Sequence, residues 1–149
     1  MQLFLSVSVC VVLSVMFSGP VQSEDSHHSG DKITAHNLSK FLKKFQHINI
    51  NNITHNDRLL TSYTSCFLNK GPCSTESREL KRAFPIIMKT SCGSCKSEQK
   101  KKVQTLLKAI KSHKPQEWKE MLALYDPSEE YRKQINKLVK HKKPASSDD

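Results

Sequence analysis

Glycine is scarce in this chain of 149 residues, which contains only four. Four glycines leave little room for a phosphate-binding loop, and the sequence has neither a nucleophile elbow nor a paired-carboxylate motif. It also lacks the HExxH zinc motif, and no cysteine or carboxylate cluster stands at ligand spacing from His27 and His28, so we interpret both as solvated. These absences indicate a binding protein that is not an enzyme and that has no metal or cofactor.

The alternation of apolar and polar residues that marks a half-buried strand is also missing, and no internal repeat is visible. Apolar residues recur instead at helical spacing over residues 37–140. Helix starts are predicted at the capping residues Asn56, Ser74 and Ser97 and at Pro115, which suits the first position of a helix. Lys102 and its neighbouring lysines are expected to point largely away from the apolar stripe. The sequence therefore predicts an all-α fold, a compact bundle of about six short helices in one domain.

The N-terminal residues 1–23 carry no charge, are mostly apolar and end in Val21-Gln22-Ser23, a small-x-small cleavage pattern. This composition predicts a signal peptide, although an uncleaved anchor helix is the alternative. The continuous apolar run, about 15 residues, is short for a membrane span. Cleavage would remove Cys10 and leave four cysteines, which is consistent with an oxidising compartment. We therefore expect a secreted, extracellular protein without a transmembrane segment after cleavage.

Two polar segments flank the helical domain. Residues 24–36 lack periodicity and are predicted to form a flexible arm, and residues 141–149 are predicted to be a disordered tail with basic and acidic residues. Asn37 and Asn52 each begin an Asn-x-Ser/Thr sequon, so both are candidate glycosylation sites in a secreted chain. We expect Asn37, in the more mobile segment, to be modified more readily.

Positive charge dominates the chain, whose formal net charge is +10 and whose pI is about 9.5. Such a balance suits anionic partners, although a solvated charged face is the ordinary interpretation. The basic run over residues 132–143 is the best candidate for a surface that docks on a receptor or a host component, through Lys133, Lys137, Lys140 and Lys142. No specific nucleic-acid partner is expected, and the protein is predicted to be a monomer.

Four cysteines lie close together in sequence: Cys66, Cys73, Cys92 and Cys95. The short gaps within the first and last pairs favour local pairing, while three pairings are formally possible. The CxxC at the end of this segment could also act in thiol exchange, but such a site needs a βαβ setting that this chain lacks. Secretion and the gap of six residues in the first pair argue against zinc.

The spacing of six, eighteen and two residues between these cysteines resembles that of the insect chemosensory proteins, a family of olfactory-specific protein D-like carriers. RLLxxY before Cys66 and WKEMLALYDP from Trp118 onward strengthen the resemblance, which covers residues 41–131. It implies a secreted six-helix protein with two sequential disulfides, Cys66–Cys73 and Cys92–Cys95, around an apolar tunnel for long-chain ligands. It also implies an extended lead-in over residues 41–45, where the apolar periodicity predicts a helix instead.

Helical stripes of this kind usually form a solid core, so the tunnel is an expectation from the resemblance. Carried over by position, its lining would be Ile48, Ile53, Leu60, Tyr63, Leu80, Phe84, Ile87, Leu106, Leu107, Ile110 and Trp118. The hydroxyl of Tyr63 could meet a ligand head group. The implied function is a carrier that binds small hydrophobic ligands, such as long-chain fatty acids or semiochemicals, in chemosensory or related transport. The alternative is a secreted basic interaction protein, such as a salivary effector, that acts through surface contacts.

Overall fold

The computed structural model describes residues 32–140, which belong to one compact unit that begins at Lys32. The predicted signal peptide, most of the predicted arm and the predicted tail lie outside these residues. So do Cys10, His27 and His28.

Helices and their connecting loops make up the whole of the described segment, in which no strand occurs. Seven α-helices and one 3-10 helix follow in order: α1 (Leu38–Leu42), η1 (Lys43–Phe45), α2 (Ile50–Thr54), α3 (Asp57–Phe67), α4 (Thr75–Thr90), α5 (Ser97–His113), α6 (Pro115–Tyr125) and α7 (Arg132–Leu138). The predicted all-α bundle is confirmed. The additional helical segment is α1 with η1. The apolar periodicity predicted a helix over these residues, and that prediction is confirmed. The extended lead-in that the resemblance implied is wrong for this chain.

Local capping chemistry explains most of the helix boundaries. The side chains of Asn56 and Ser74 accept hydrogen bonds from backbone N–H groups in the first turns of α3 and α4, and Pro115 begins α6, as predicted. The prediction for Ser97 is wrong by one residue, because Lys96 is the N-cap of α5. The backbone N–H of Lys96 donates to Oε1 of Gln99 at 3.0 Å, so a side chain three residues later closes this helix start.

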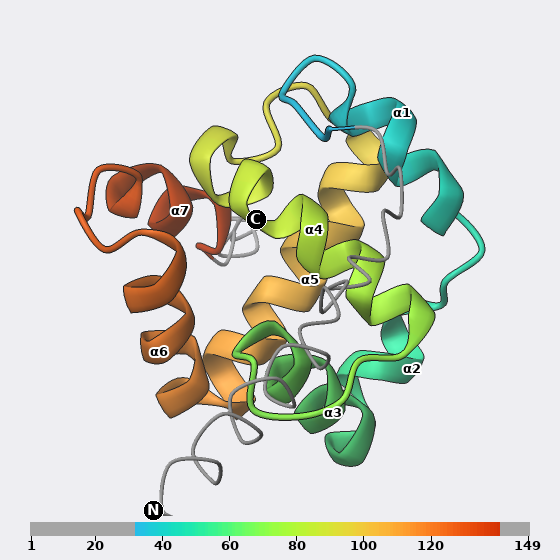
Figure 1. Ribbon diagram of the computed structural model, residues 1–149, viewed down its shortest axis with the longest axis vertical. Helices are drawn as coiled ribbons and strands as arrows, with labels where there is room; N and C mark the ends of the chain where they lie inside the picture. Colours follow the sequence, from blue (N-terminus) through green and yellow to red (C-terminus); the bar gives the residue numbers. More distant parts are fainter. Residues whose placement is uncertain (1–31, 141–149) are drawn as a thin grey trace, which may run out of the picture. The chain divides into compact units, whose positions relative to one another are not determined.

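Two long helices, α4 and α5, cross the middle of the unit, with α6 and α7 on one side and α1 and α2 on the other (Figure 1). Helix α5 packs against both α2 and α6, while α4 packs against α3 and α6. Helices α4 and α5 therefore both contact helices that precede them and helices that follow them in the chain.

The larger of two apolar clusters, which we call the aromatic core, is built around the neighbouring rings of Phe67, Phe84 and Tyr125. Phe84 of α4 lies 5.1 Å from Phe67 and 4.7 Å from Tyr125, measured between ring centroids. The Tyr125 hydroxyl donates to the backbone carbonyl of Phe67 at 2.7 Å, which joins the ends of α6 and α3. Met88 and Met121 fill the remaining space and are at most 1% exposed. Dense packing of this kind gives the fold most of its hydrophobic stabilisation.

The smaller apolar cluster, which we call the N-terminal cluster, comprises Leu38, Leu42, Ala83, Ile87 and Cys92. It holds α1 against α4. Because α1 has only five residues, burial of its two leucines, rather than intrinsic helix propensity, must stabilise it.

Both disulfides pair neighbouring cysteines. Cys66 is bonded to Cys73 between the end of α3 and the loop before α4, and Cys92 is bonded to Cys95 in the turn between α4 and α5. The sequential pairing that the resemblance implied is therefore present. Each bridge closes a short loop at a helix end, where it restricts the unfolded chain and fixes the entry of the next helix.

Candidate functional site

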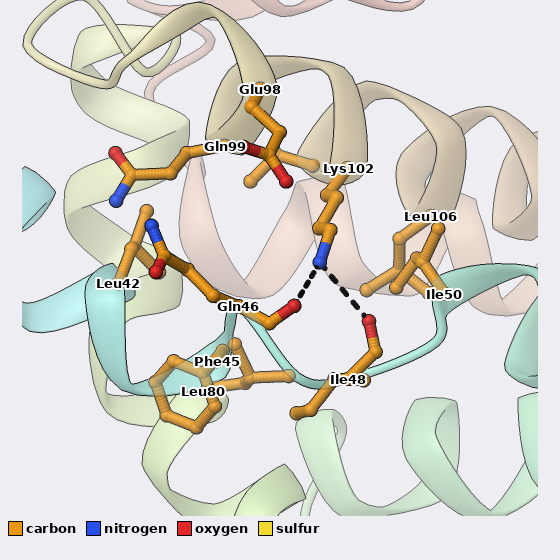
Figure 2. Close-up of a pocket in the computed structure, with 11 residues that line it drawn as sticks. Leu42, Phe45, Gln46, Ile48, Ile50, Leu80, Glu98, Gln99, Lys102 and Leu106 are labelled. Atoms are coloured by element: carbon orange, nitrogen blue, oxygen red, sulfur yellow. Dashed lines mark hydrogen bonds between the residues drawn. The ribbon is translucent and has the colours of Figure 1, made fainter.

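A small apolar pocket lies where η1, the loop over residues 46–49 and the start of α2 meet the first half of α5 (Figure 2). Its volume is about 60 Å³. Most of its lining is aliphatic or aromatic: Leu42, Phe45, Ile48, Ile50, Leu80, Val103 and Leu106. Leu42 comes from the end of α1 and Leu80 from α4, so these two helices also contribute to the apolar lining. A pocket of this composition suits an apolar ligand.

Four polar residues complete the lining: Gln46, Glu98, Gln99 and Lys102. Three of them lie on the first two turns of α5, with Glu98 and Lys102 one turn apart. Glu98 is exposed, Lys102 is half-buried and Gln99 is 6% exposed. Most of the polar groups therefore come from α5, and Gln46 comes from the loop after η1.

Lys102 ties the loop over residues 46–49 to α5. Its Nζ donates to the backbone carbonyl of Gln46 at 2.5 Å and to that of Ile48 at 3.3 Å. Figure 2 shows the side chain reaching from α5 to these two carbonyls at the rim of the pocket. The prediction that Lys102 points away from the apolar stripe is therefore wrong. Its stem borders the pocket, and its ammonium bridges two segments of the chain.

Gln99 makes the corresponding connection to α1. Its Nε2 donates to the Ser39 carbonyl at 2.8 Å, and its Oε1 accepts from the Ser39 hydroxyl at 3.0 Å and from the Lys96 N–H at 3.0 Å. A buried amide with three partners holds its position firmly. Residues 99 and 102, three apart on one helix, thus fix both ends of the segment that covers the pocket.

The residues predicted to line a tunnel fall into three groups in the structure. Ile48, Leu80 and Leu106 line the pocket. The aromatic core contains Ile53, Leu60, Phe84, Leu107, Ile110 and Trp118, with Tyr63 packed against it, and the N-terminal cluster contains Ile87. The structure thus brings the first three together with four apolar residues that were not predicted: Leu42, Phe45, Ile50 and Val103.

Tyr63 was the predicted contact for a ligand head group. It is half-buried in α3, and its ring meets that of Phe67 edge-on at 6.1 Å between centroids. Burial raises the pKa of the Tyr63 phenol above its ordinary value of 10.0, and the nearby negative charge of Glu76 raises it further. The side chain does not line the pocket, and its role toward a ligand stays a prediction.

The two sequons differ in their surroundings. Asn37 is half-buried, and its Nδ2 donates to the Lys32 carbonyl at 2.9 Å while its Oδ1 accepts from the Thr34 N–H at 2.7 Å. Asn52 is exposed on α2. The Asn37 side chain is therefore held by local hydrogen bonds, whereas that of Asn52 faces solvent.

Two features that residues 32–140 lack bear on other classes of function. No three His, Cys, Asp or Glu side chains in this segment lie together in a way that could hold a metal ion. None of its helices is both long enough and apolar enough to cross a membrane.

Fold and pocket together define a class of small all-helical proteins with two local disulfides and an apolar site between short helices. Within that class, the chain belongs to the insect pheromone-binding family A10/OS-D, whose sequence profile matches residues 41–133. The resemblance to insect chemosensory proteins is thereby confirmed.

Individual relatives agree with this membership. The chain is 37% identical over 94 residues to ejaculatory bulb-specific protein 3 of Drosophila melanogaster, covering 63% of this chain and 75% of the relative. It is 30% identical over 102 residues to allergen Tha p 1 of Thaumetopoea pityocampa, covering 66% and 81%. A solved structure of a chemosensory protein in complex with bromo-dodecanol matches with a TM-score of 0.58 at 30% identity, covering 65% of this chain and 97% of that one.

Proposed function

We propose that this protein is a secreted carrier that binds small hydrophobic ligands, such as long-chain fatty acids or semiochemicals, at the pocket between η1, α2 and α5. The observation that carries the proposal is the pocket itself, a mostly apolar site with a few polar groups in its lining. The solved relative in complex with bromo-dodecanol, a halogenated long-chain alcohol, supports a ligand of this kind. We also propose that residues 1–23 are removed on secretion and that Asn37 and Asn52 are available for glycosylation.

A long-chain ligand requires the pocket to widen. Ligand pockets typically measure roughly 300–1,000 Å³, whereas this one measures about 60 Å³. The covering segment is suited to such movement, because η1 contains no buried residue and the following loop is held to α5 by the Lys102 side chain. The expected gain is about 0.8 kcal/mol per buried methylene, from which the cost of ordering the chain is subtracted. Micromolar affinity follows for about ten methylenes.

The other predicted tunnel residues would contact the ligand only if its chain also pushed apart the packed side chains of the aromatic core. Phe84 and Ile110 are 3% and 0% exposed, so contact with them requires displacement of packed side chains. We therefore assign initial binding to Ile48, Leu80 and Leu106 with their neighbours, and propose deeper insertion toward the aromatic core as a second step.

The test is to fill the pocket without changing its charge. Val103, half-buried in the pocket lining, is replaced by Trp, and Leu124, 47% exposed on α6, is replaced by Trp as the matched control. A delipidated sample is titrated with a fluorescent long-chain probe, which is then displaced with fatty acids. We expect Val103→Trp to weaken probe binding by about tenfold or more, because a filled pocket buries fewer methylenes.

Leu124→Trp should leave the affinity unchanged, and circular dichroism should report the same helix content for both variants. Equal probe affinity in wild type and Val103→Trp would place binding elsewhere. Absence of probe binding in the wild type would refute the carrier proposal.

A second candidate function, docking of a secreted effector on an anionic partner, is favoured by the arrangement of α5 and α7. Nε2 of Gln104 donates to the Leu138 carbonyl at 3.2 Å, which brings the end of α7 beside α5. Lys137 and Lys140 are exposed there. We rank this candidate second because solvated lysine faces are common on basic proteins.

A further inference from the structure

Lys102 is the only cationic side chain among the residues that line the pocket. An ammonium group has three N–H donors and no hydrogen-bond acceptor. Two of the three are directed at the carbonyls of Gln46 and Ile48, so one donor remains for a further partner. The ammonium thus stands at the rim of an apolar site with one hydrogen bond still to give.

No carboxylate of the described segment forms an ion pair with this ammonium. Glu98 also lines the pocket one turn earlier on α5, but it is exposed and none of the ion pairs found over residues 32–140 joins it to Lys102. The two neutral carbonyls accept hydrogen bonds from two of its donors but do not balance its charge. An anionic group can do both, through a shorter and stronger charge-assisted hydrogen bond.

We infer that the pocket selects ligands with a carboxylate head group, and that Lys102 is the residue that determines this specificity. The inference rests on the proposed function and narrows it from apolar chains in general to fatty acids over the corresponding alcohols. The alkyl chain lies against Val103, Leu106 and the other apolar lining residues. The carboxylate accepts a hydrogen bond from Nζ of Lys102 at the rim.

The same contact explains how the pocket widens. In the structure, Lys102 holds the loop over residues 46–49 against α5 through the two carbonyls. A carboxylate competes with these carbonyls for the ammonium, which weakens the attachment of the loop. A neutral alcohol competes much less well, so the head group that binds Lys102 also favours the wider pocket. This is a population shift driven by differential contacts in the two states.

Glu98 provides an opposing contribution that can be measured independently. Its carboxylate lies on the same rim and repels an anionic head group, although exposure to water weakens the repulsion. Replacing Glu98 by Gln should therefore strengthen acid binding slightly and leave alcohol binding unchanged. If Lys102 acted only by holding the loop, charges at the rim would not affect acid and alcohol binding differently.

The experiment compares dodecanoic acid with dodecanol, which share a chain and differ in the head group. Each displaces the fluorescent long-chain probe at about pH 8, well above the ordinary carboxyl pKa. The variants are Lys102→Met, which keeps an unbranched stem, Glu98→Gln, and Lys101→Met as the matched control on the exposed face of α5. We expect Lys102→Met to weaken acid binding by about tenfold, the equivalent of one charged hydrogen bond. Alcohol binding should not weaken in the same variant, because the loop over residues 46–49 is then no longer held against α5 by Lys102.

Lys101→Met should change neither affinity, and Glu98→Gln should raise acid affinity by up to about twofold. Because the acid-to-alcohol ratio is taken within each variant, a partial loss of fold cancels from the comparison. Equal affinities for acid and alcohol in the wild type, or an unchanged ratio in Lys102→Met, would overturn the inference while leaving the carrier proposal intact. Failure of the wild type to bind the probe or either ligand would instead remove the proposed function on which the inference rests.

Discussion

The aromatic core and the pocket are built from similar apolar residues, yet they are closed in different ways. Phe67 and Phe84 are 0% and 3% exposed and contact one another through their rings. Phe45 and Val103, on the pocket side, are only half-buried. The aromatic core is closed by side-chain packing, whereas the pocket is closed by two polar side chains of α5 that hold a short segment in place.

Because of this difference, the aromatic core contributes more to the stability of the fold, and the pocket side can move more easily. Packed rings cannot move apart without losing many contacts at once, so separating the aromatic core should cost much more free energy than widening the pocket. The hydrogen bonds of Lys102 can be exchanged for bonds to water or to a ligand at modest cost. Ligand uptake is therefore expected on the side of the molecule that contributes least to the stability of the fold.

The largest effect is expected from truncating the centre of the aromatic core. Replacing Phe84 by Ala should lower the free energy of unfolding by about 3–5 kcal/mol, because it removes two ring contacts and leaves a cavity. Replacing Val103 by Ala should cost about 1 kcal/mol or less, since this side chain is half-buried and faces the pocket. Denaturant unfolding of oxidised protein, followed by circular dichroism, measures both.

Equal losses in the two variants would contradict the proposed division between a stabilising side and an adaptable side. Leu124→Ala, an exposed position on α6, serves as the reference for a change outside both regions. It should shift stability by no more than about 0.5 kcal/mol.

A smaller effect on stability is expected from removing the Tyr125 hydroxyl group from the aromatic core. Replacing Tyr125 by Phe removes the hydrogen bond to the Phe67 carbonyl and should cost about 1 kcal/mol. Burial raises the pKa of the Tyr125 phenol above its ordinary value of 10.0. Its contribution to stability is therefore complete below pH 10 and is lost as pH rises through the higher pKa of the folded state.

Unfolding measured between about pH 8 and pH 11 tests this sign. The wild type should lose stability more steeply at the alkaline end than Tyr125→Phe, which lacks the ionising group. Tyr63→Phe is a useful comparison, because burial and Glu76 raise the pKa of that phenol as well. If Tyr125→Phe had the same alkaline slope as the wild type, the phenol of Tyr125 would not be linked to folding.

Much of the fold could be predicted because local signals agreed with one another. Asn56, Ser74 and Pro115 mark helix starts by their own chemistry, and the apolar periodicity identified even the short helix α1, where the family pattern suggested an extended chain. The N-cap of α5 was misplaced by one residue because the deciding hydrogen bond comes from Gln99, a side chain inside the helix. Capping by Ser97 was the more common pattern, and the sequence alone offered no reason to prefer the other.

The pocket was harder to predict because it depends on contacts between distant segments. Leu42 and Phe45 belong to an apolar stripe that was visible in the sequence, but the stripe does not show that its partner is α5. Lys102 was not predicted to line the pocket, because it lies in a run of three lysines that is typical of a solvated helix face. Its distinguishing feature, two backbone carbonyls from residues 46 and 48, exists only once the chain has folded.

The smallest expected effect concerns the basic surface at the end of the described chain. Replacing Lys137 and Lys140 together by Ser should change the affinity for the long-chain probe by less than about twofold, because exposed charges outside the pocket contribute little to a neutral alkyl chain. The same titration on Val103→Trp provides the contrast, since that change fills the pocket and keeps every lysine. If the lysine variant lost probe binding while Val103→Trp bound normally, ligand recognition would belong to the basic surface. The carrier proposal would then give way to surface docking, and the comparison between aromatic core and pocket would concern stability alone.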